Sequence, residues 1–219
     1  MSLWIKICGN TSLGDARLAV EAGADAVGFV FAPSPRRVTV SEAAGITPHL
    51  PGAVEKIGVF VDATPDEIYA AVRACRLTGV QLHSEAGPEL PEKLRALLGP
   101  ELRILRVVHF GPEAAAQADT IAADPHVDAL LVDSRTAAAV GGTGIAFDWT
   151  TARETLFRRS ARMKMVAAGG LNPENVAEAI ATLRPWGVDV VSGVEAEPGR
   201  KDPIKVRSFV AVARGAART

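Results

Sequence analysis

Two short apolar segments of the chain each end with a side chain that can exchange a proton with a substrate. Near the N-terminus, Leu3–Cys8 ends in a thiol that a glycine follows, and far along the chain Ala129–Ser134 carries the carboxylate of Asp133. A thiolate can act as a general base and a carboxyl group as a general acid. If both segments belong to one ring of parallel strands, both groups lie at its C-terminal end, where such enzymes keep their catalytic residues. The pair therefore predicts acid–base chemistry by Cys8 and Asp133.

Two loops after such segments contain residues suited to an anionic substrate. The loop Ala32–Arg37 has two prolines and the adjacent Arg36 and Arg37, and guanidinium groups in a stiff loop suit bidentate recognition of a carboxylate. A solvated surface pair is the alternative interpretation. Beyond Asp133, residues 141–144 read Gly-Gly-Thr-Gly. These glycines, Gly142 among them, allow the backbone to approach a ligand, although a plain mobile turn has the same composition.

A second set of glycines predicts a phosphate subsite. The last two expected strands are followed by Gly169-Gly170 and by Ser192-Gly193. In barrels of parallel strands, the loops after the seventh and eighth strands often present backbone N–H groups to a phosphate. One such glycine pair is weak evidence, but two in successive units favour a phosphorylated substrate.

Eight short apolar or β-branched segments recur along the chain, with room for a helix between each pair. Helix-start signals lie between them, such as Thr64-Pro65 and Asp202-Pro203, where an N-cap residue precedes proline. Strands that alternate with helices predict parallel pairing. We therefore predict an α/β protein, a single (β/α)8 TIM barrel over residues 1–219, with an open doubly wound sheet as the alternative. The expected strands are Leu3–Cys8, Ala26–Phe31, Lys56–Val61, Gly79–His83, Arg103–His109, Ala129–Ser134, Met163–Ala168 and Gly187–Ser192.

Alternation along these strands predicts a barrel interior that is polar toward one end. Unpaired buried charges are costly, so such groups must pair or line a wet cavity. Lys6 and Asp189 lie on the first and eighth strands, which are neighbours in a closed barrel, and we expect an ion pair between them. The polar residues expected inside are Lys6, Gln81, His83, Arg106, Asp133 and Asp189.

Composition limits the classes of partner. The 219 residues are 48% hydrophobic and 22% charged with a net charge of −1, which gives no electrostatic case for nucleic acid. No apolar segment is long enough to span a membrane and no signal peptide opens the chain, so we expect a cytoplasmic protein.

Cys8 and Cys75 are then expected to be free thiols. The four histidines lack the spacing of metal ligands, so we expect no metal site.

The motifs along the chain resemble those of the phosphoribosylanthranilate isomerase family. The resemblance runs in order over nearly the whole sequence, which makes it specific. The family is a (β/α)8 barrel of the tryptophan pathway. It converts N-(5-phosphoribosyl)anthranilate to 1-(2-carboxyphenylamino)-1-deoxyribulose 5-phosphate without a cofactor. The matching segments are Lys6–Gly9, Ala26–Phe31, Ser34–Arg37, Gly58–Val61, Val80–His83, Leu131–Asp133, residues 141–144 with Phe147–Trp149, Ala168–Asn175 and Ser192–Glu195.

The resemblance implies a role for each candidate residue. Cys8 matches the general base that removes the proton from sugar C2, and Asp133 matches the general acid that protonates the furanose oxygen. Arg37 matches the arginine that binds the anthranilate carboxylate. The other residues matched to substrate binding are Asp189, Gly142, Gly170, Ser192 and Gly193. The implied partner is a small phosphorylated molecule, bound by a monomer or a homodimer.

This chemistry places demands on two pKa values. The Cys8 thiolate must be accessible near neutral pH, and we expect the cationic Lys6 to lower its pKa. Asp133 must keep its proton, and we expect apolar surroundings to raise its pKa.

Two positions depart from the family pattern, and two other functions stay open. Asn10 stands where an apolar residue is common, and Ser84 replaces a frequent glycine; both flank expected site loops. A Schiff-base aldolase that uses Lys6 is one alternative. A non-catalytic phosphosugar-binding barrel is the other, although Cys8 and Asp133 argue against it.

Overall fold

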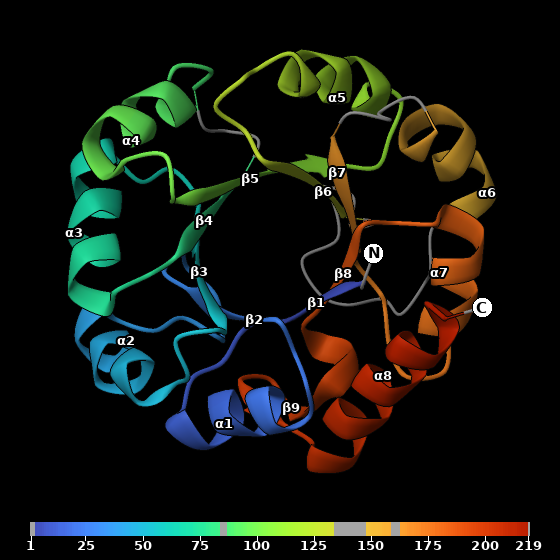
Figure 1. Cartoon of the computed structure of the whole chain (residues 1–219), viewed down its shortest axis with the longest axis horizontal. Helices are drawn as coiled ribbons and strands as arrows, with labels where there is room; N and C mark the ends of the chain where they lie inside the picture. The colour runs from blue at the N-terminus through green and yellow to red at the C-terminus, as the bar shows by residue number, and fades with distance from the viewer. Residues whose placement is uncertain (1–2, 84–86, 134–147, 159–162, 219) are drawn as a thin grey trace.

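The structure, a computed structural model of the chain, describes residues 3–83, 87–133, 148–158 and 163–218. Within these residues eight parallel strands pair in sequence order, and β1 pairs with β8 to close a barrel. Figure 1 shows this ring of strands with the helices around it. The predicted (β/α)8 barrel is confirmed. The strands are β1 (Trp4–Ile7), β2 (Ala26–Val30), β3 (Glu55–Phe60), β4 (Gly79–Leu82), β5 (Arg103–His109), β6 (Ala129–Asp133), β7 (Lys164–Ala168) and β8 (Gly187–Val190).

The helices that follow the strands cover the outside of the barrel. Both expected start signals are observed. Thr64 forms a capping box with Glu67, and the Asp202 side chain accepts hydrogen bonds from the first backbone N–H groups of the last helix. The helices are α1 (Leu13–Glu21), α2 (Val40–Ile46), α3 (Pro65–Cys75), α4 (Leu90–Leu98), α5 (Ala114–Ala122), α6 (Trp149–Ala152), α7 (Val176–Leu183) and α8 (Pro203–Ala216). Shorter elements are η1 (Thr47–His49), η2 (Arg153–Phe157), η3 (Ser192–Val194) and the strand pair β9 (Glu195–Glu197) and β10 (Arg200–Lys201).

The side chains of the strands alternate between the barrel interior and the layer beneath the helices. Trp4, Leu105 and Leu131 belong to one apolar cluster inside the barrel, and Ile5, Ile104 and Val188 to the outer cluster. The prediction that Arg106 points inward is wrong. Its neighbours Leu105 and Val107 are the inward residues of β5, and the electrostatic partner of Arg106 is Asp124, which follows α5 outside the barrel.

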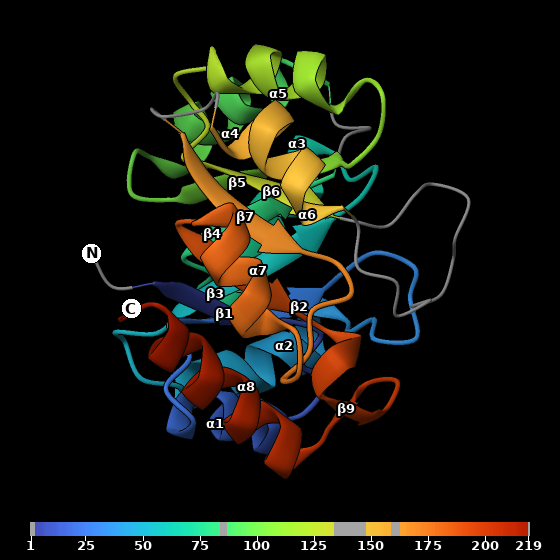
Figure 2. The same ribbon diagram turned by 90° about the vertical axis from the view of Figure 1, so that its right-hand side faces the viewer.

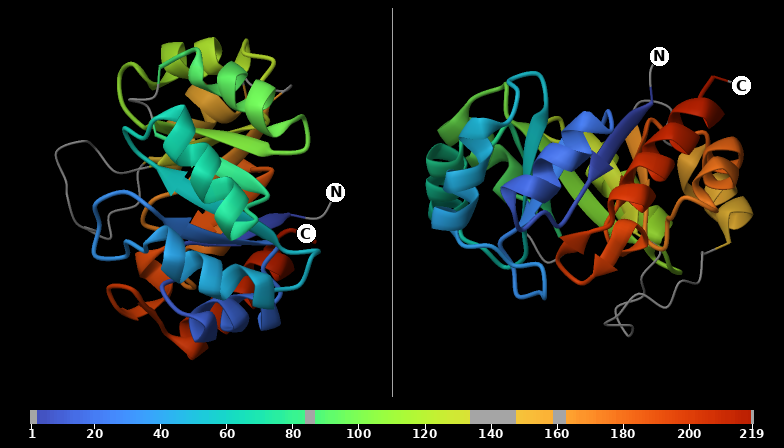
Figure 3. Two further views of the ribbon diagram at one scale, coloured as in Figure 1. Left: turned by 90° about the vertical axis from the view of Figure 1, so that its left-hand side faces the viewer. Right: turned by 90° about the horizontal axis from the view of Figure 1, so that it is seen from below.

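Aromatic residues close the N-terminal end of the barrel. The rings of Trp4 and Trp186 stack with centroids 5.1 Å apart, and the guanidinium of Arg103 lies 5.5 Å from the Trp186 ring. Both chain termini lie at this end, and the β9–β10 pair lies at the other (Figures 2 and 3). The C-terminal rim is therefore the end left for a site. Among the described helices, none is long and apolar enough to cross a membrane.

Candidate active site

Cys8 lies immediately after β1, on the C-terminal rim. Its backbone N–H donates to the Val190 carbonyl over 2.9 Å, so Cys8 is fixed to β8 although the regular strand ends at Ile7. The residue is 3% exposed. Gly9 follows with φ +72, a backbone conformation that glycine adopts without strain, and the chain turns away there.

A glycine on the neighbouring strand makes room for the thiol. A Cβ added at Gly28 of β2 would lie 2.4 Å from Cys8 Sγ and 3.0 Å from Lys6 Cε. No role for Gly28 is predicted from the sequence. Its signal is the lack of a side chain at an inward position, two residues after the inward Ala26 of the same strand.

Lys6 pairs with Asp189 beneath the thiol, as predicted. Its Nζ lies 2.9 Å from Asp189 Oδ1 and 2.8 Å from Gln81 Oε1, and Lys6 is fully buried. Burial disfavours the ammonium, but the charges of Asp189 and Cys8 outweigh this effect, so the pKa of Lys6 is raised. A lysine held in its charged form is a poor amine nucleophile, which disfavours the Schiff-base aldolase.

The thiol of Cys8 does not have the lowered pKa that we expected. Burial raises it most, while the cations of Lys6 and Lys201 lower it and the Asp189 carboxylate raises it again. The balance leaves the pKa of Cys8 above its ordinary value. Lys6 acts in the expected direction, but removal of the thiol from water has the larger effect.

Asp133 ends β6 on the same rim, where it is 3% exposed. In the strand register it lies between His109 of β5 and Ala168 of β7. His109 shares its inward orientation, because it follows Leu105 and Val107 in alternation. The rings of His109 and His83 lie 5.9 Å apart. The structure thus places the His109 imidazole beside the candidate acid. From the sequence, His109 is considered only as a metal ligand.

The two adjacent arginines have different surroundings. Arg36 forms a bidentate ion pair with Glu195, with Nε 2.9 Å from Oε1 and Nη2 2.7 Å from Oε2. Arg37 is exposed, and within the described part of the chain its guanidinium has no hydrogen bond or ion pair. Its backbone is fixed, because Arg37 N–H donates to Ser34 O over 3.0 Å. The cation that remains for a substrate carboxylate is Arg37.

The two glycine loops after β7 and β8 contact one another. Gly169 and Gly170 have φ values of +80 and +65, and a Cβ added at Gly193 would lie 1.9 Å from the Leu171 carbonyl oxygen. Gly193 is therefore required by the packing of the two loops, which is a tighter constraint than the approach of a ligand alone. Ser192 is exposed at the start of η3. Gly142 lies outside the described residues, as does Ser84.

Asn10 connects the first two strand ends. It is fully buried, and its Nδ2 donates to Ile7 O over 2.8 Å and to Gly28 O over 3.1 Å. The amide thus adds a donor to both carbonyl groups, although Gly28 O also accepts from the Asn10 backbone N–H over 3.0 Å. Among the described residues Asn10 Oδ1 has no hydrogen-bond partner. The two hydrogen bonds of Nδ2 explain how the departure from the family pattern is accommodated.

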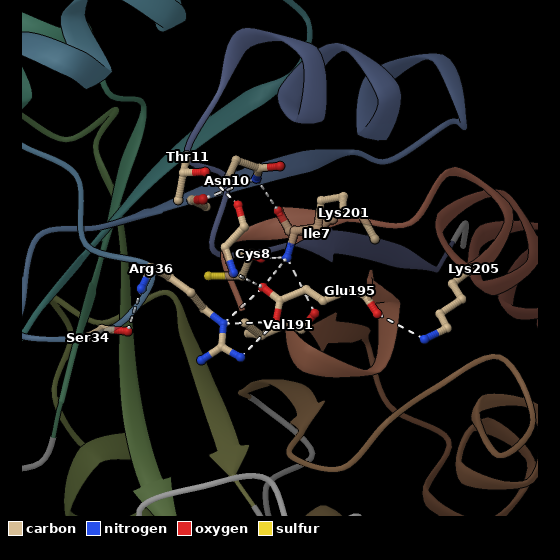
Figure 4. Close-up of polar contacts among 12 residues, drawn as sticks. Ile7, Cys8, Asn10, Thr11, Ser34, Arg36, Val191, Glu195, Lys201 and Lys205 are labelled. Carbon is tan, nitrogen blue, oxygen red and sulfur yellow. Dashed lines mark hydrogen bonds and ion pairs between the residues drawn. The ribbon is translucent and has the colours of Figure 1, made fainter. Parts of the chain in front are cut away.

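Two buried charged residues near Cys8, Glu195 and Lys201, have no role predicted from the sequence, although Glu195 ends one of the matching segments. Glu195 is 6% exposed and Lys201 is 3% exposed, and they form an ion pair of 3.2 Å. Figure 4 shows them beside Cys8 and Arg36. Both lie beyond the last barrel strand, where strand alternation gives no prediction. In the part of the chain that the structure describes, no group of three or more potential ligands could hold a metal ion.

Comparison with known proteins identifies the family. Residues 5–212 match the model of N-(5'phosphoribosyl)anthranilate (PRA) isomerase. The N-(5'-phosphoribosyl)anthranilate isomerase of Trichlorobacter lovleyi is 43% identical over 97% of this chain and 98% of its own length.

Solved structures agree in fold. A phosphoribosyl anthranilate isomerase in complex with reduced 1-(o-carboxyphenylamino)-1-deoxyribulose 5-phosphate has a TM-score of 0.80 at 36% identity, covering 97% of this chain and 99% of its own. Monomers generated from the dimeric enzyme of Thermotoga maritima have a TM-score of 0.79 at 36% identity, with the same coverage of 97% and 99%. The chain belongs to the N-(5'-phosphoribosyl)anthranilate isomerase family.

Proposed function

We propose that this chain isomerises N-(5-phosphoribosyl)anthranilate to 1-(2-carboxyphenylamino)-1-deoxyribulose 5-phosphate, with Cys8 as general base and Asp133 as general acid. The observation that carries the proposal is the arrangement of the C-terminal rim. Two buried proton-exchanging groups end β1 and β6 there, in a chain whose family model covers residues 5–212. The activity is that of an isomerase of tryptophan biosynthesis.

The reaction begins with two proton transfers at different atoms of the sugar. Asp133 donates a proton to the furanose oxygen, the bond from C1 to that oxygen breaks, and the nitrogen lone pair forms a C1=N double bond. The Cys8 thiolate then removes the proton from C2, and that electron pair forms a C1=C2 bond while the iminium becomes neutral. Return of a proton to C1 and loss of the C2 hydroxyl proton give the ketose. A separate acid and base suit this sequence because each acts on a different atom.

The remaining residues bind the two anionic ends of the substrate. Arg37 is proposed to bind the anthranilate carboxylate, because its guanidinium is exposed on a loop whose backbone is fixed. Gly170, Ser192 and Gly193 are proposed to bind the phosphate through backbone N–H groups. Asp189 lies beneath the site, where its carboxylate keeps Lys6 in its charged form. The role of Gly142 stays a prediction from the resemblance.

The substrate is a small phosphorylated molecule, and a solved relative binds a ligand of that kind. We also propose a cytoplasmic location, because the substrate is a free biosynthetic intermediate. For the oligomeric state we propose a monomer or a homodimer, since the solved Thermotoga maritima relative is a dimeric enzyme. A monomer would satisfy the proposed mechanism equally, because every proposed residue comes from one chain.

One assay tests the activity directly. Freshly generated N-(5-phosphoribosyl)anthranilate is fluorescent, and addition of the purified protein should abolish its fluorescence with multiple turnovers. Cys8→Ser and Asp133→Asn should each lower kcat by at least about 100-fold, as expected for loss of a general base or acid. No turnover by the folded wild-type protein would refute the isomerase. Covalent trapping of a sugar phosphate on Lys6 by borohydride would support the aldolase instead.

A further inference from the structure

Three charged residues form a connected group behind Cys8, and we call it the rim cluster: Arg36, Glu195 and Lys201. Lys201 comes from β10, and its side chain is fully buried. Its Nζ donates to three oxygen atoms: the Cys8 carbonyl at 2.5 Å, the Val191 carbonyl at 3.3 Å and Glu195 Oε1 at 3.2 Å. All three protons of the ammonium therefore have partners, and two of these partners are backbone carbonyls at the ends of β1 and β8 (Figure 4).

The contact to Cys8 fixes the backbone of the proposed base. A carbonyl beyond the regular strand has no ladder partner and would otherwise rely on water. Lys201 supplies that partner, so the peptide between Cys8 and Gly9 is held on its carbonyl side as the Val190 contact holds Cys8 on its N–H side. The direction of the Cα–Cβ bond of Cys8, and with it the thiol, is then determined on both sides.

Glu195 extends the same cluster to the loop of Arg37. Its two carboxylate oxygens accept hydrogen bonds from Nε and Nη2 of Arg36, and Oε1 also accepts from Lys201 Nζ. Burial raises the pKa of Glu195, but these cations outweigh it, so the pKa is lowered and the carboxylate is charged. Arg36 precedes Arg37 in the chain, so the anchor of the first arginine restricts the position of the second.

The packing of the loops supports this connection. Thr11 Oγ1 donates to Gly199 O over 2.6 Å, and a Cβ added at Gly199 would lie 3.3 Å from Pro35 O. The loops after β1 and β2 and the β9–β10 turn are therefore in mutual contact around the cluster.

We propose that Lys201 is a positioning residue for the Cys8 base, and that Glu195 and Arg36 extend this restraint to the Arg37 loop. The inference rests on the proposed roles of Cys8 and Arg37. It assigns the short β9–β10 pair a purpose beyond stability, because this pair carries the lysine that binds the Cys8 carbonyl. Within the cluster, the charge of Lys201 also lowers the pKa of Cys8, in the direction that favours the thiolate, although burial has the larger effect.

The experiment compares Lys201→Met with a matched control. Lys56 is also a buried lysine, at 6% exposed, and its Nζ donates to the carbonyls of Pro51 and Val54 over 3.1 and 3.0 Å, near the start of β3 at the far end of the barrel. Lys56→Met therefore removes an equivalent lysine without touching the rim. Both variants, and Lys201→Arg, are made in a Cys75→Ser background. The pH dependence of Cys8 alkylation by a small reagent and the kinetic constants are then measured.

Lys201→Met should raise the midpoint pH of Cys8 alkylation by about one unit, the shift typical for loss of a nearby opposite charge. It should lower kcat about 10- to 100-fold, as expected when a reacting group is misplaced by about 1 Å. Lys56→Met should leave the midpoint pH unchanged. Lys201→Arg should keep the midpoint near its wild-type value, because the positive charge is kept. The alkylation midpoint does not depend on turnover, so it tests the link to Cys8 even if Cys8 is not the base.

An unchanged midpoint in folded Lys201→Met, with a kcat equal to that of Lys56→Met, would overturn the proposal. Arg36→Met tests the second part of the proposal, the restraint on the Arg37 loop, and it remains usable if Lys201→Met does not fold, because Arg36 is partly exposed at 18% of its side chain. This variant should raise KM at least about fivefold with kcat changed less than about twofold, an effect of impaired substrate binding. An unchanged KM would show that the cluster does not position the Arg37 loop.

Discussion

Replacement of Gly28 by alanine tests whether the space for the thiol on β2 is needed for catalysis. The added methyl group would lie 2.4 Å from Cys8 Sγ, 3.0 Å from Cys8 Cβ and 3.0 Å from Lys6 Cε. The first distance is far below van der Waals contact, so the thiol must move. Lys6 cannot yield easily, because its Nζ is held by Asp189 at 2.9 Å and by Gln81 at 2.8 Å. The thiol is therefore expected to leave its position.

Two quantities should change together. Overpacking of one methyl group in a closed interior costs about 1–3 kcal/mol of unfolding free energy. A displacement of the reacting group by about 1 Å should lower kcat by about 100-fold. Denaturant unfolding gives the first quantity, and the fluorescence assay with the substrate gives the second.

Gly58→Ala is the matched control. A Cβ at Gly58 of β3 would lie 2.7 Å from Leu77 Cδ1 and 2.7 Å from Phe60 Cε2, so it is overpacked as well. It points into the layer beneath the helices, because the inward residue of β3 beside it is Ile57. We expect comparable destabilisation with kcat within about threefold of wild type. If Gly28→Ala loses stability but keeps wild-type kcat, the position of the thiol does not limit catalysis and the reasoning is refuted.

The other predictions concern substrate binding and pH. Arg37→Met should weaken the binding of a carboxylated product analogue by about 1.5–3 kcal/mol, the contribution of a charge-assisted hydrogen bond, as measured by calorimetry. Equal weakening of the binding of an analogue without the carboxylate would contradict this prediction. Gly193→Val should raise the Kd of a phosphorylated analogue far more than that of its dephosphorylated form. The valine Cβ would lie 1.9 Å from the Leu171 carbonyl oxygen, so the loop must move. Equal effects on the two Kd values would argue against a phosphate site there. Because burial raises the pKa of Cys8 and only the thiolate is alkylated, the rate of Cys8 alkylation in a Cys75→Ser background should rise about tenfold per pH unit between about pH 7 and 8.5. A flat alkylation profile over this range would show that the pKa of the thiol is not raised.

The fold could be predicted from the sequence because its signals are local. Apolar strand segments recur in all eight units, and side-chain N-caps such as Thr64 and Asp202 begin several of the helices. Alternation along β1 and β8 correctly predicted the contact of Lys6 with Asp189. For Arg106 the same alternation predicts the wrong face of β5, because nothing local in this strand shows which of its two alternating sets of side chains faces inward. The inward set is determined by packing against the neighbouring strands.

The details of the site depend on contacts between distant residues. Arg36 and Arg37 are identical side chains at adjacent positions. Arg36 is the one that forms an ion pair, because Glu195 lies beside it in the fold although it is 159 residues away in the sequence. The pKa of Cys8 results from opposing effects of burial and of charges from three elements. Its direction follows only when the size of each effect is known, which the sequence does not provide.

The ion pair of Lys6 and Asp189 has a consequence for synthesis of the chain on the ribosome. The partners are 183 residues apart, so at about 5–20 residues per second Lys6 is made roughly 10–40 s before its carboxylate partner. During that time a nascent barrel would have to bury an unpaired ammonium, which is strongly unfavourable. The N-terminal strand therefore cannot adopt its final environment until the eighth strand has emerged. Closure of the ring is delayed until translation is almost complete, and until then β1 has an open edge on the side that β8 will occupy.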